Sequence, residues 1–322
     1  MSYLDFYFET SAYNFIADKL NIYDTIATKA YQSLKGNRYL ISPLTVWEVL
    51  LNGSDDKREQ LVYFSQHLFH NKLLRTPSEL VIDYIYELIY GQVNSKMFTE
   101  SNIGFVWTDL CQDSRKTFVF DKEILIKRSK LIQHISKNLR KIISDTIIIN
   151  EEDIYRNEIS LLRELVNIHF NSLRIDKISY LSRDRIIILK TAILFIYLLL
   201  YLELDFENGP VIHFWRKIRI VNDSDKINFL IKLSRRLLDE GPFVYMALMA
   251  YSQMQQSGKL GRGVVFDSLH TLYIPYADYL LTNDNHFIKF SPLINKSNGD
   301  KIKLIREQDW SFSEMDIVYP NI

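Results

Sequence analysis

The chain has 322 residues, of which 47% are hydrophobic, so it is long enough for one large domain or two ordinary ones and too apolar to be disordered. Its 39 basic and 39 acidic side chains balance, which excludes a protein that binds nucleic acid through a large overall positive charge. Its single cysteine, Cys111, excludes an intramolecular disulfide and a zinc site built from several cysteines, and it fits a reducing cytoplasm.

The N-terminal part of the chain is predicted to alternate between strands and helices. LDFYF (4–8) is an extended apolar run, and Thr10 or Ser11 can cap the helix that follows it. RYLIS (38–42) is a second β-like run. Ser42 and Pro43 then supply an N-cap and a first helical residue for the next helix. Strand, helix, strand and helix in this order indicate a parallel sheet with crossover helices.

A long middle region has helical periodicity instead. We expect helices at 123–143, 158–173 and 225–240, with polar turn signals between the periodic segments. Residues 186–204 are strongly apolar, but Lys190 and Glu203 interrupt them, so we expect a buried helix rather than a membrane span. The acidic residues near the N-terminus do not resemble a secretory signal, and we expect a cytoplasmic protein.

The alternating pattern returns near the C-terminus. YLL (279–281) is a strand-like run that stops at Thr-Asn-Asp, and IKLI (302–305) is predicted to be the last strand. We therefore predict one α/β domain with a parallel sheet, formed by both chain ends and carrying a mainly α-helical insertion. Its parts are 1–57 and 251–322, and the insertion is 58–250.

Four acidic residues occupy strand ends or early helical turns in the two α/β parts: Glu9, Glu48, Asp267 and Asp284. The carboxyl ends of parallel strands lie at one edge of a sheet, so these residues could form one cluster. Neighbouring carboxylates cannot all ionise unless a cation neutralises them. Mg²⁺ or Mn²⁺ would meet this need, since both prefer oxygen ligands. Alternatively, Asp284 is part of an ordinary turn, because Asn and Asp favour turns.

Three sequence blocks resemble the PIN-domain nucleases. They are FETSAYNFI, SPLTVWEVL and FDSLHTLYIPYADYLLTNDNHF, and the resemblance covers roughly residues 1–55 and 258–310. The positions that match the family's motifs are Glu9 with Thr10, Glu48, Asp267, and Asp284 with Thr282 and Asn283. The family usually has Asp at the position of Glu9, and the helical insertion has no counterpart in it.

The resemblance implies a PIN-like three-layer fold and a metal-dependent endonuclease that favours RNA over DNA. Asp284, Asp267 and Glu9 would hold the principal Mg²⁺ or Mn²⁺. Glu48 would bind a second ion or position the attacking water. The alternative is a catalytically degenerate PIN-like protein, altered at Glu9, that serves as a binding or scaffold module. A helical interaction protein whose carboxylates are incidental is a third hypothesis.

Other polar residues surround these four in sequence. By the same resemblance, Thr10, Thr282 and Asn283 would hydrogen-bond a carboxylate or the scissile phosphate, and Asp278 would add an acidic group near the site. His270 lies three residues after Asp267 on the same helical face, so it could contact substrate.

A basic stretch in the middle region, residues 115–146, contains nine Lys and Arg against three acidic residues. It is either a solvated helix face or a surface that contacts phosphates. In the second case we expect the contacts to come from Lys127, Arg128, Lys130, Arg140 and Lys141.

The resemblance to PIN-domain nucleases implies that the partners are nucleic acid, chiefly RNA, and an inhibitory protein that restrains a toxic nuclease. No membrane partner is expected, and a homo-oligomer is left open.

Overall fold

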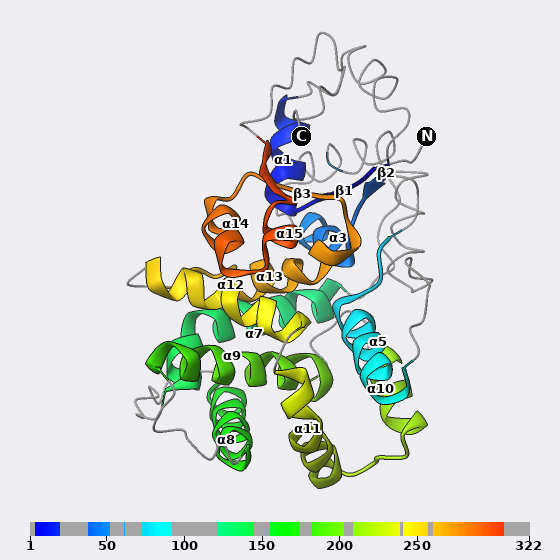
Figure 1. Cartoon of the computed structure of the whole chain (residues 1–322), viewed down its shortest axis with the longest axis vertical. Coiled ribbons are helices and arrows are strands. Elements are labelled where there is room, and N and C mark those ends of the chain that lie inside the picture. The colour runs from blue at the N-terminus through cyan, green and yellow to red at the C-terminus, as the bar shows by residue number, and fades with distance from the viewer. Residues whose placement is uncertain are drawn as a thin grey trace. The chain divides into compact units, whose positions relative to one another are not determined.

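The computed structural model describes ten parts of the chain: residues 4–19, 38–51, 61, 73–91, 122–144, 155–173, 182–202, 209–238, 241–256 and 260–305. The chain divides into two compact units (Figure 1). The first unit comprises Met1–Thr76, Lys96–Leu125 and Tyr273–Ile322, and the second comprises Pro77–Ser95 and Ile126–Leu272. The division differs from the predicted one on both sides of the insertion. Met1–Thr76 and Lys96–Leu125 belong to the first unit, although the insertion was predicted to begin at 58, and residues 251–272 belong to the second. Cys111 lies outside the described residues.

The first unit contains a four-stranded sheet in which all neighbouring strands are parallel. The strands are β1 (Asp5–Phe8), β2 (Arg38–Leu40), β3 (Tyr279–Thr282) and β4 (Ile302–Leu304), and their order across the sheet is β2-β1-β3-β4. The prediction of a parallel α/β sheet built from both ends of the chain is therefore confirmed.

Aromatic side chains fix the register of the central strands. Phe6 lies opposite Tyr39 on β2 and opposite Tyr279 on β3. Its ring stacks on both, with centroid distances of 5.7 and 5.3 Å. A shift of one residue would send these side chains to the other face of the sheet, so this three-ring row favours a single pairing.

Short helices connect these strands. They are α1 (Thr10–Lys19), α3 (Pro43–Leu50), the 3₁₀ helices η2 (Thr271–Tyr276) and η3 (Ser291–Leu293), α14 (Asn285–Phe290) and α15 (Lys296–Gly299). The Ser42 side chain caps α3 by accepting a hydrogen bond from the Thr45 amide at 3.2 Å, and Pro43 follows it. The predicted start of this helix is confirmed.

The second unit is helical in its described residues. Its helices are α5 (Pro77–Tyr90), α7 (Lys122–Ile143), α8 (Arg156–Ser172), α9 (Arg183–Leu200), α10 (Gly209–Lys217), α11 (Asp223–Leu237), α12 (Pro242–Gln256) and α13 (Val264–His270). The four helices predicted in the middle region correspond to α7, α8, α9 and α11, with ends that differ by a few residues.

Helix α9 is the core of this unit. Every residue from Lys190 to Leu200 is buried, because α12 and α8 pack against it (Figure 1). A helix that is apolar on all sides must be covered on all sides, which explains its position. In the part of the chain that the structure describes, no helix combines the length and the hydrophobicity needed to cross a bilayer.

A buried polar pair lies between α8 and α9. His169 is fully buried, and its Nδ1 lies 3.0 Å from the Tyr197 hydroxyl. Burial lowers the pKa of His169 to about 4 and raises the pKa of Tyr197, so both side chains are neutral at pH 7. The other ring nitrogen of His169, Nε2, makes no hydrogen bond.

We predict that this histidine makes stability depend on pH. The unfolded state, with a His pKa near about 6.5, takes up the proton first as the pH falls. The contribution of His169 to the free energy of unfolding is therefore complete above about pH 6.5. It is lost as the pH falls towards 4, by up to about 1.4 kcal/mol per pH unit.

The measurement is denaturant unfolding from pH 7.5 to 4.5 for Tyr197→Phe and for the double variant His169→Phe/Tyr197→Phe. Both variants lack the hydroxyl, so they differ only in the imidazole. The double variant should lose less stability on acidification, and parallel curves would contradict the prediction.

Candidate functional site

The strand order singles out one position in the sheet for ligand binding. From β1 the chain passes to β2 on one side, whereas from β3 it passes to β4 on the other side. The side of the sheet to which the chain moves on therefore reverses between the neighbouring strands β1 and β3. In open parallel sheets, ligands bind outside the carboxyl ends of the strands at this reversal point. The residues that follow β1 and β3 are Glu9 and the Thr282–Asp284 segment.

Glu9 is a buried carboxylate at the end of β1, with 5% of its surface exposed. Its amide donates to the Leu281 carbonyl at 3.0 Å, which continues the pairing with β3. Its Oε1 accepts a hydrogen bond from the Ser11 amide at 3.0 Å. Its Oε2 accepts from the Thr282 hydroxyl at 3.0 Å and from the Ser11 hydroxyl. These donors stabilise a buried negative charge that would otherwise be unfavourable.

The Thr282–Asp284 segment is both a turn and part of this cluster. The Thr282 hydroxyl, which donates to Glu9, accepts a hydrogen bond from the Asp284 amide at 2.9 Å. The main-chain amide of Asn283 donates to the Ser11 hydroxyl at 2.9 Å. Asp284 is the N-cap of α14, because its Oδ1 accepts from the His286 amide at 2.8 Å. The turn interpretation of the Asp284 side chain is thus correct for one of its two oxygens.

A second carboxylate joins the cluster from α3. Glu48 is partly buried, and its Oε2 accepts a hydrogen bond from the Thr10 hydroxyl. Thr10 is the first residue of α1 and directly follows Glu9. The start of α1 therefore holds two carboxylates, with Ser11 bound to one of them and Thr10 to the other.

Tyr7 provides a neutral hydroxyl near both carboxylates. It is fully buried, and its hydroxyl lies 2.9 Å from that of Ser42. Burial raises the pKa of Tyr7 well above its ordinary value, and the negative charges of Glu9 and Glu48 raise it further. The phenol therefore keeps its proton at neutral pH and can donate a hydrogen bond.

Sequence reasoning missed Tyr7 and the role of Ser11. Tyr7 could have been found by strand alternation, because residues two apart point to the same face and Tyr7 precedes Glu9 by two. For Ser11 the sequence predicts only a possible helix cap.

In the described part of the first unit, two side-chain amide oxygens are buried and accept no hydrogen bond, Asn283 Oδ1 and Asn14 Oδ1. Asn283 lies between Thr282 and Asp284, and Asn14 lies one helical turn after Ser11 on α1. A buried acceptor without a partner costs roughly 1–3 kcal/mol, so such atoms are rare and call for an explanation. At Asn283 the explanation we favour is a ligand, because this residue directly follows Thr282, whose hydroxyl donates to Glu9.

The oxygen-rich donor set suits a hard divalent cation. Carboxylates of Glu9, Glu48 and Asp284 and the amide oxygen of Asn283 are the ligand types that Mg²⁺ and Mn²⁺ prefer. Among the described residues, no group of three or more His, Cys, Asp or Glu side chains is arranged to hold a metal ion. Mg²⁺ is commonly bound through one or two carboxylates, with waters and substrate phosphates completing its shell.

Asp267 and His270 belong to the second unit, on α13. The Asp267 Oδ2 accepts a hydrogen bond from Gln253 Nε2 at 2.8 Å. The His270 side chain is fully buried, so the surface needed for the expected substrate contact is absent in this structure. The convergence of Asp267 with the three carboxylates of the first unit stays a prediction.

Asp278 does not join the cluster. It precedes β3, and its carboxylate accepts a hydrogen bond from the Asp5 amide at 2.8 Å at the start of β1. The strand β3, four residues or roughly 13 Å long at about 3.3 Å per residue, lies between it and Asp284. Asp278 therefore lies at the amino edge of the sheet, opposite to the expected position.

The basic stretch contributes an exposed face on α7. Lys127, Lys130, Arg140 and Lys141 are exposed, and Arg128 is partly buried. Positions 127, 130, 137 and 141 all carry lysine and are three, seven and four residues apart, so they lie on one face. The Arg140 guanidinium donates to the Met254 carbonyl on α12. This face remains compatible with both solvation and phosphate contacts.

Protein-family models, curated proteins and solved structures were compared with this chain, and none of them matches it. The chemistry of the cluster is therefore inferred from its own geometry. It combines acidic oxygens, neutral hydroxyls and an unbonded amide oxygen at the reversal point of a parallel sheet. Such a set can bind a cation or the donor groups of a ligand.

We predict a strong energetic coupling between Thr282 and Glu9. Thr282→Val removes the hydroxyl but keeps the shape, which leaves the buried carboxylate of Glu9 with one donor fewer. The expected loss is about 1–3 kcal/mol of unfolding free energy, and it should shrink when Glu9→Gln removes the charge. Denaturant unfolding of the two single variants and the double variant measures this coupling.

Thr191→Val is the matched control. Thr191 is also fully buried, but its hydroxyl donates to the Ile187 carbonyl within α9. Its effect should be the same with Glu9 and with Gln at position 9. Additive effects of Thr282→Val and Glu9→Gln would show that the hydrogen bond does not organise the site.

Proposed function

We propose that this protein is a divalent-metal-dependent endonuclease that hydrolyses phosphodiester bonds, with RNA favoured over DNA. The observation that carries the proposal is the hydrogen bond from Thr282 to Glu9. It joins the ends of β1 and β3 at the reversal point, and Asn283 and Asp284 directly follow Thr282 in the sequence. The resemblance of three sequence blocks to PIN-domain nucleases supports the same activity.

In this proposal each cluster residue has one task. Glu9, Glu48 and Asp284 provide carboxylate oxygens for Mg²⁺ or Mn²⁺. The resemblance to PIN-domain nucleases adds Asp267 to these ligands. When bound, such an ion would polarise the phosphodiester and increase the acidity of a water molecule. The other groups position these carboxylates or the ligand.

The hydroxyls fix the carboxylates in place. Thr282 holds Glu9 and Thr10 holds Glu48, so neither side chain is free to rotate when an ion binds. Asn283 offers its unbonded oxygen. Tyr7 keeps its proton and so adds no further negative charge.

Further expectations belong to the same proposal. They are a PIN-like three-layer arrangement of the α/β part, a cytoplasmic location, an RNA partner and an inhibitory protein that restrains cleavage. A homo-oligomer is compatible with the proposal but is not required by it.

A catalytically degenerate PIN-like binding or scaffold protein is the second candidate. It is favoured by the hydrogen bonds of Glu9, whose two oxygens already accept from Ser11 and Thr282, and by the capping role of Asp284. A carboxylate that serves the fold in this way does not need a metal. In this case the protein would bind its partner without cleaving it.

We predict that the purified protein cleaves single-stranded RNA in the presence of Mn²⁺ and that EDTA abolishes the cleavage. Asp284→Asn should lower the rate about a hundredfold or more, because it removes a charged ligand while the amide oxygen can still cap α14. The measurement is the initial rate on RNA and DNA substrates, including tRNA.

Asp278→Asn provides the control for this variant. It makes the same chemical change at the opposite edge of the sheet, and it should leave the cleavage rate within about twofold. Equal losses in the two variants, or full activity of Asp284→Asn, would rule out the proposed site. Binding without metal-dependent cleavage would favour the degenerate alternative.

A further inference from the structure

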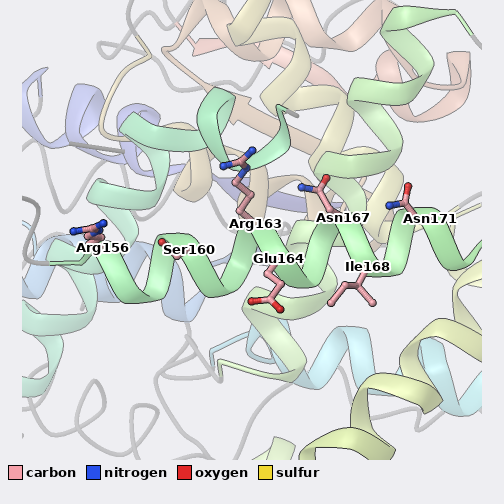
Figure 2. A pocket seen from close by; sticks show the side chains of 7 residues that line it. All are labelled: Arg156, Ser160, Arg163, Glu164, Asn167, Ile168 and Asn171. Atoms are coloured by element: carbon pink, nitrogen blue, oxygen red, sulfur yellow. The ribbon is translucent and has the colours of Figure 1, made fainter. Parts of the chain in front are cut away.

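A groove runs along α8 in the second unit, and the proposed metal site does not use it. Its volume is about 500 Å³. Six of its lining side chains are polar: Arg156, Ser160, Arg163, Glu164, Asn167 and Asn171 (Figure 2). Positions 156, 160, 163, 167 and 171 are three or four residues apart, so they form one row over roughly 22 Å of helix.

The donors of this row are concentrated on one side of the helix. Figure 2 shows Arg163, Asn167 and Asn171 projecting from the same side of α8, whereas Glu164 and Ile168 project from the opposite side. Glu164 nevertheless lines the same groove, so its negative charge partly offsets the positive charges there. The row itself presents guanidinium and amide groups.

Two buried contacts hold the middle of the row in place. Arg163 has only 9% of its surface exposed, and its Nε donates to the Ser144 carbonyl at 3.3 Å. Lys190 is 3% exposed, and its Nζ donates to the Asn167 Oδ1 at 3.0 Å. Because the amide oxygen of Asn167 faces the ammonium, its NH₂ group points away from Lys190 and can donate to a ligand.

The charge balance of the groove favours an anion. Arg156, Arg163 and the buried Lys190 supply three positive charges, and Glu164 supplies one negative charge. Guanidinium and amide donors at fixed positions match the oxygens of phosphate groups. None of the lining side chains that the structure describes is aromatic, so a bound base would find no stacking partner among them.

We propose that the α8 groove binds the phosphate backbone of a single-stranded nucleic acid, independently of its sequence. The length of the row favours a chain of phosphates over a single one. The choice of a nucleic acid as the occupant rests on the proposed nuclease function, whereas the anion-binding chemistry does not.

The test is fluorescence anisotropy of a short labelled oligo(U) strand, titrated with the full-length protein in EDTA at several salt concentrations. EDTA prevents metal-dependent cleavage, so binding is measured alone. The groove variant is Arg156→Glu/Asn171→Asp, since both residues are exposed and their replacement should leave the fold intact. Thermal unfolding of each variant checks this.

The groove variant should bind at least about tenfold more weakly than the wild type, because its charge-assisted hydrogen bonds to the phosphates are removed. The slope of log K against log salt should also decrease, by about 0.7 for each phosphate that the variant no longer neutralises. Lys232→Glu, at an exposed position on α11, changes the net charge equally to Arg156→Glu and should have less than about a twofold effect.

Three results would overturn the proposal. The first is absence of binding by the wild type. The second is weakening by Lys232→Glu, or by Lys130→Glu/Lys137→Glu on α7, that equals or exceeds the effect of the groove variant. The third is competition by inorganic phosphate or uridine monophosphate that equals that of the RNA at the same phosphate concentration, which would indicate a small phosphorylated ligand.

The two proposals can fail separately. Asp278→Asn changes an acidic residue outside both proposed sites, so it should leave binding in EDTA unchanged. Groove-dependent binding without any metal-dependent cleavage would refute the nuclease and leave the groove. If the groove variant binds the oligonucleotide normally while the protein still cleaves RNA, the proposed role of the groove is refuted and the nuclease proposal stands.

Discussion

The buried negative charge of Glu9 is the constraint on which the sheet edge depends. A carboxylate with 5% of its surface exposed is stable only when hydrogen-bond donors surround it. Those donors come from the first turn of α1 and from the last residue of β3, which are more than 270 residues apart in sequence. The strand pairing, the start of α1 and the end of β3 must therefore all be correct before this charge can be buried. A misaligned strand would leave Glu9 without the Thr282 hydroxyl, so the charge selects the register as well as benefiting from it.

Hydroxyl groups are the means by which this edge tolerates several carboxylates. Thr282 lies against Glu9, Thr10 lies against Glu48, and Tyr7 stays protonated near both. Each hydroxyl can donate to an oxygen and adds no charge, so it lowers the repulsion between neighbouring acids without a cation. The same arrangement is required of a metal site in its free form and of a protein that no longer binds metal. The structure of the cluster is therefore common to both candidate functions, and only the response to metal separates them.

Local sequence signals predicted the elements well because each depends on a few neighbouring residues. The N-cap of Ser42 followed by Pro43, the apolar periodicity of α7 and the short β-like runs all correspond to observed elements. The order of the strands depends on contacts across the whole chain, and no local pattern contains it. Asp278 illustrates the difference. It is six residues from Asp284 and was expected nearby, but the strand between them carries the two carboxylates to opposite edges of the sheet.

The short Thr-Asn-Asp segment combines two roles that the sequence presents as alternatives. Asp284 is a helix cap, and capping engages its Oδ1 with the His286 amide. A carboxylate has two oxygens, so a cap can still contribute to a ligand site with the other one. Thr282 and Asn283 also contribute to the fold. Thr282 does so through its hydroxyl, which donates to Glu9, and Asn283 through its main-chain amide, which donates to Ser11. Asn283 then retains a buried oxygen that the fold does not use. One short segment can therefore form a turn and still carry oxygens that the turn itself does not need.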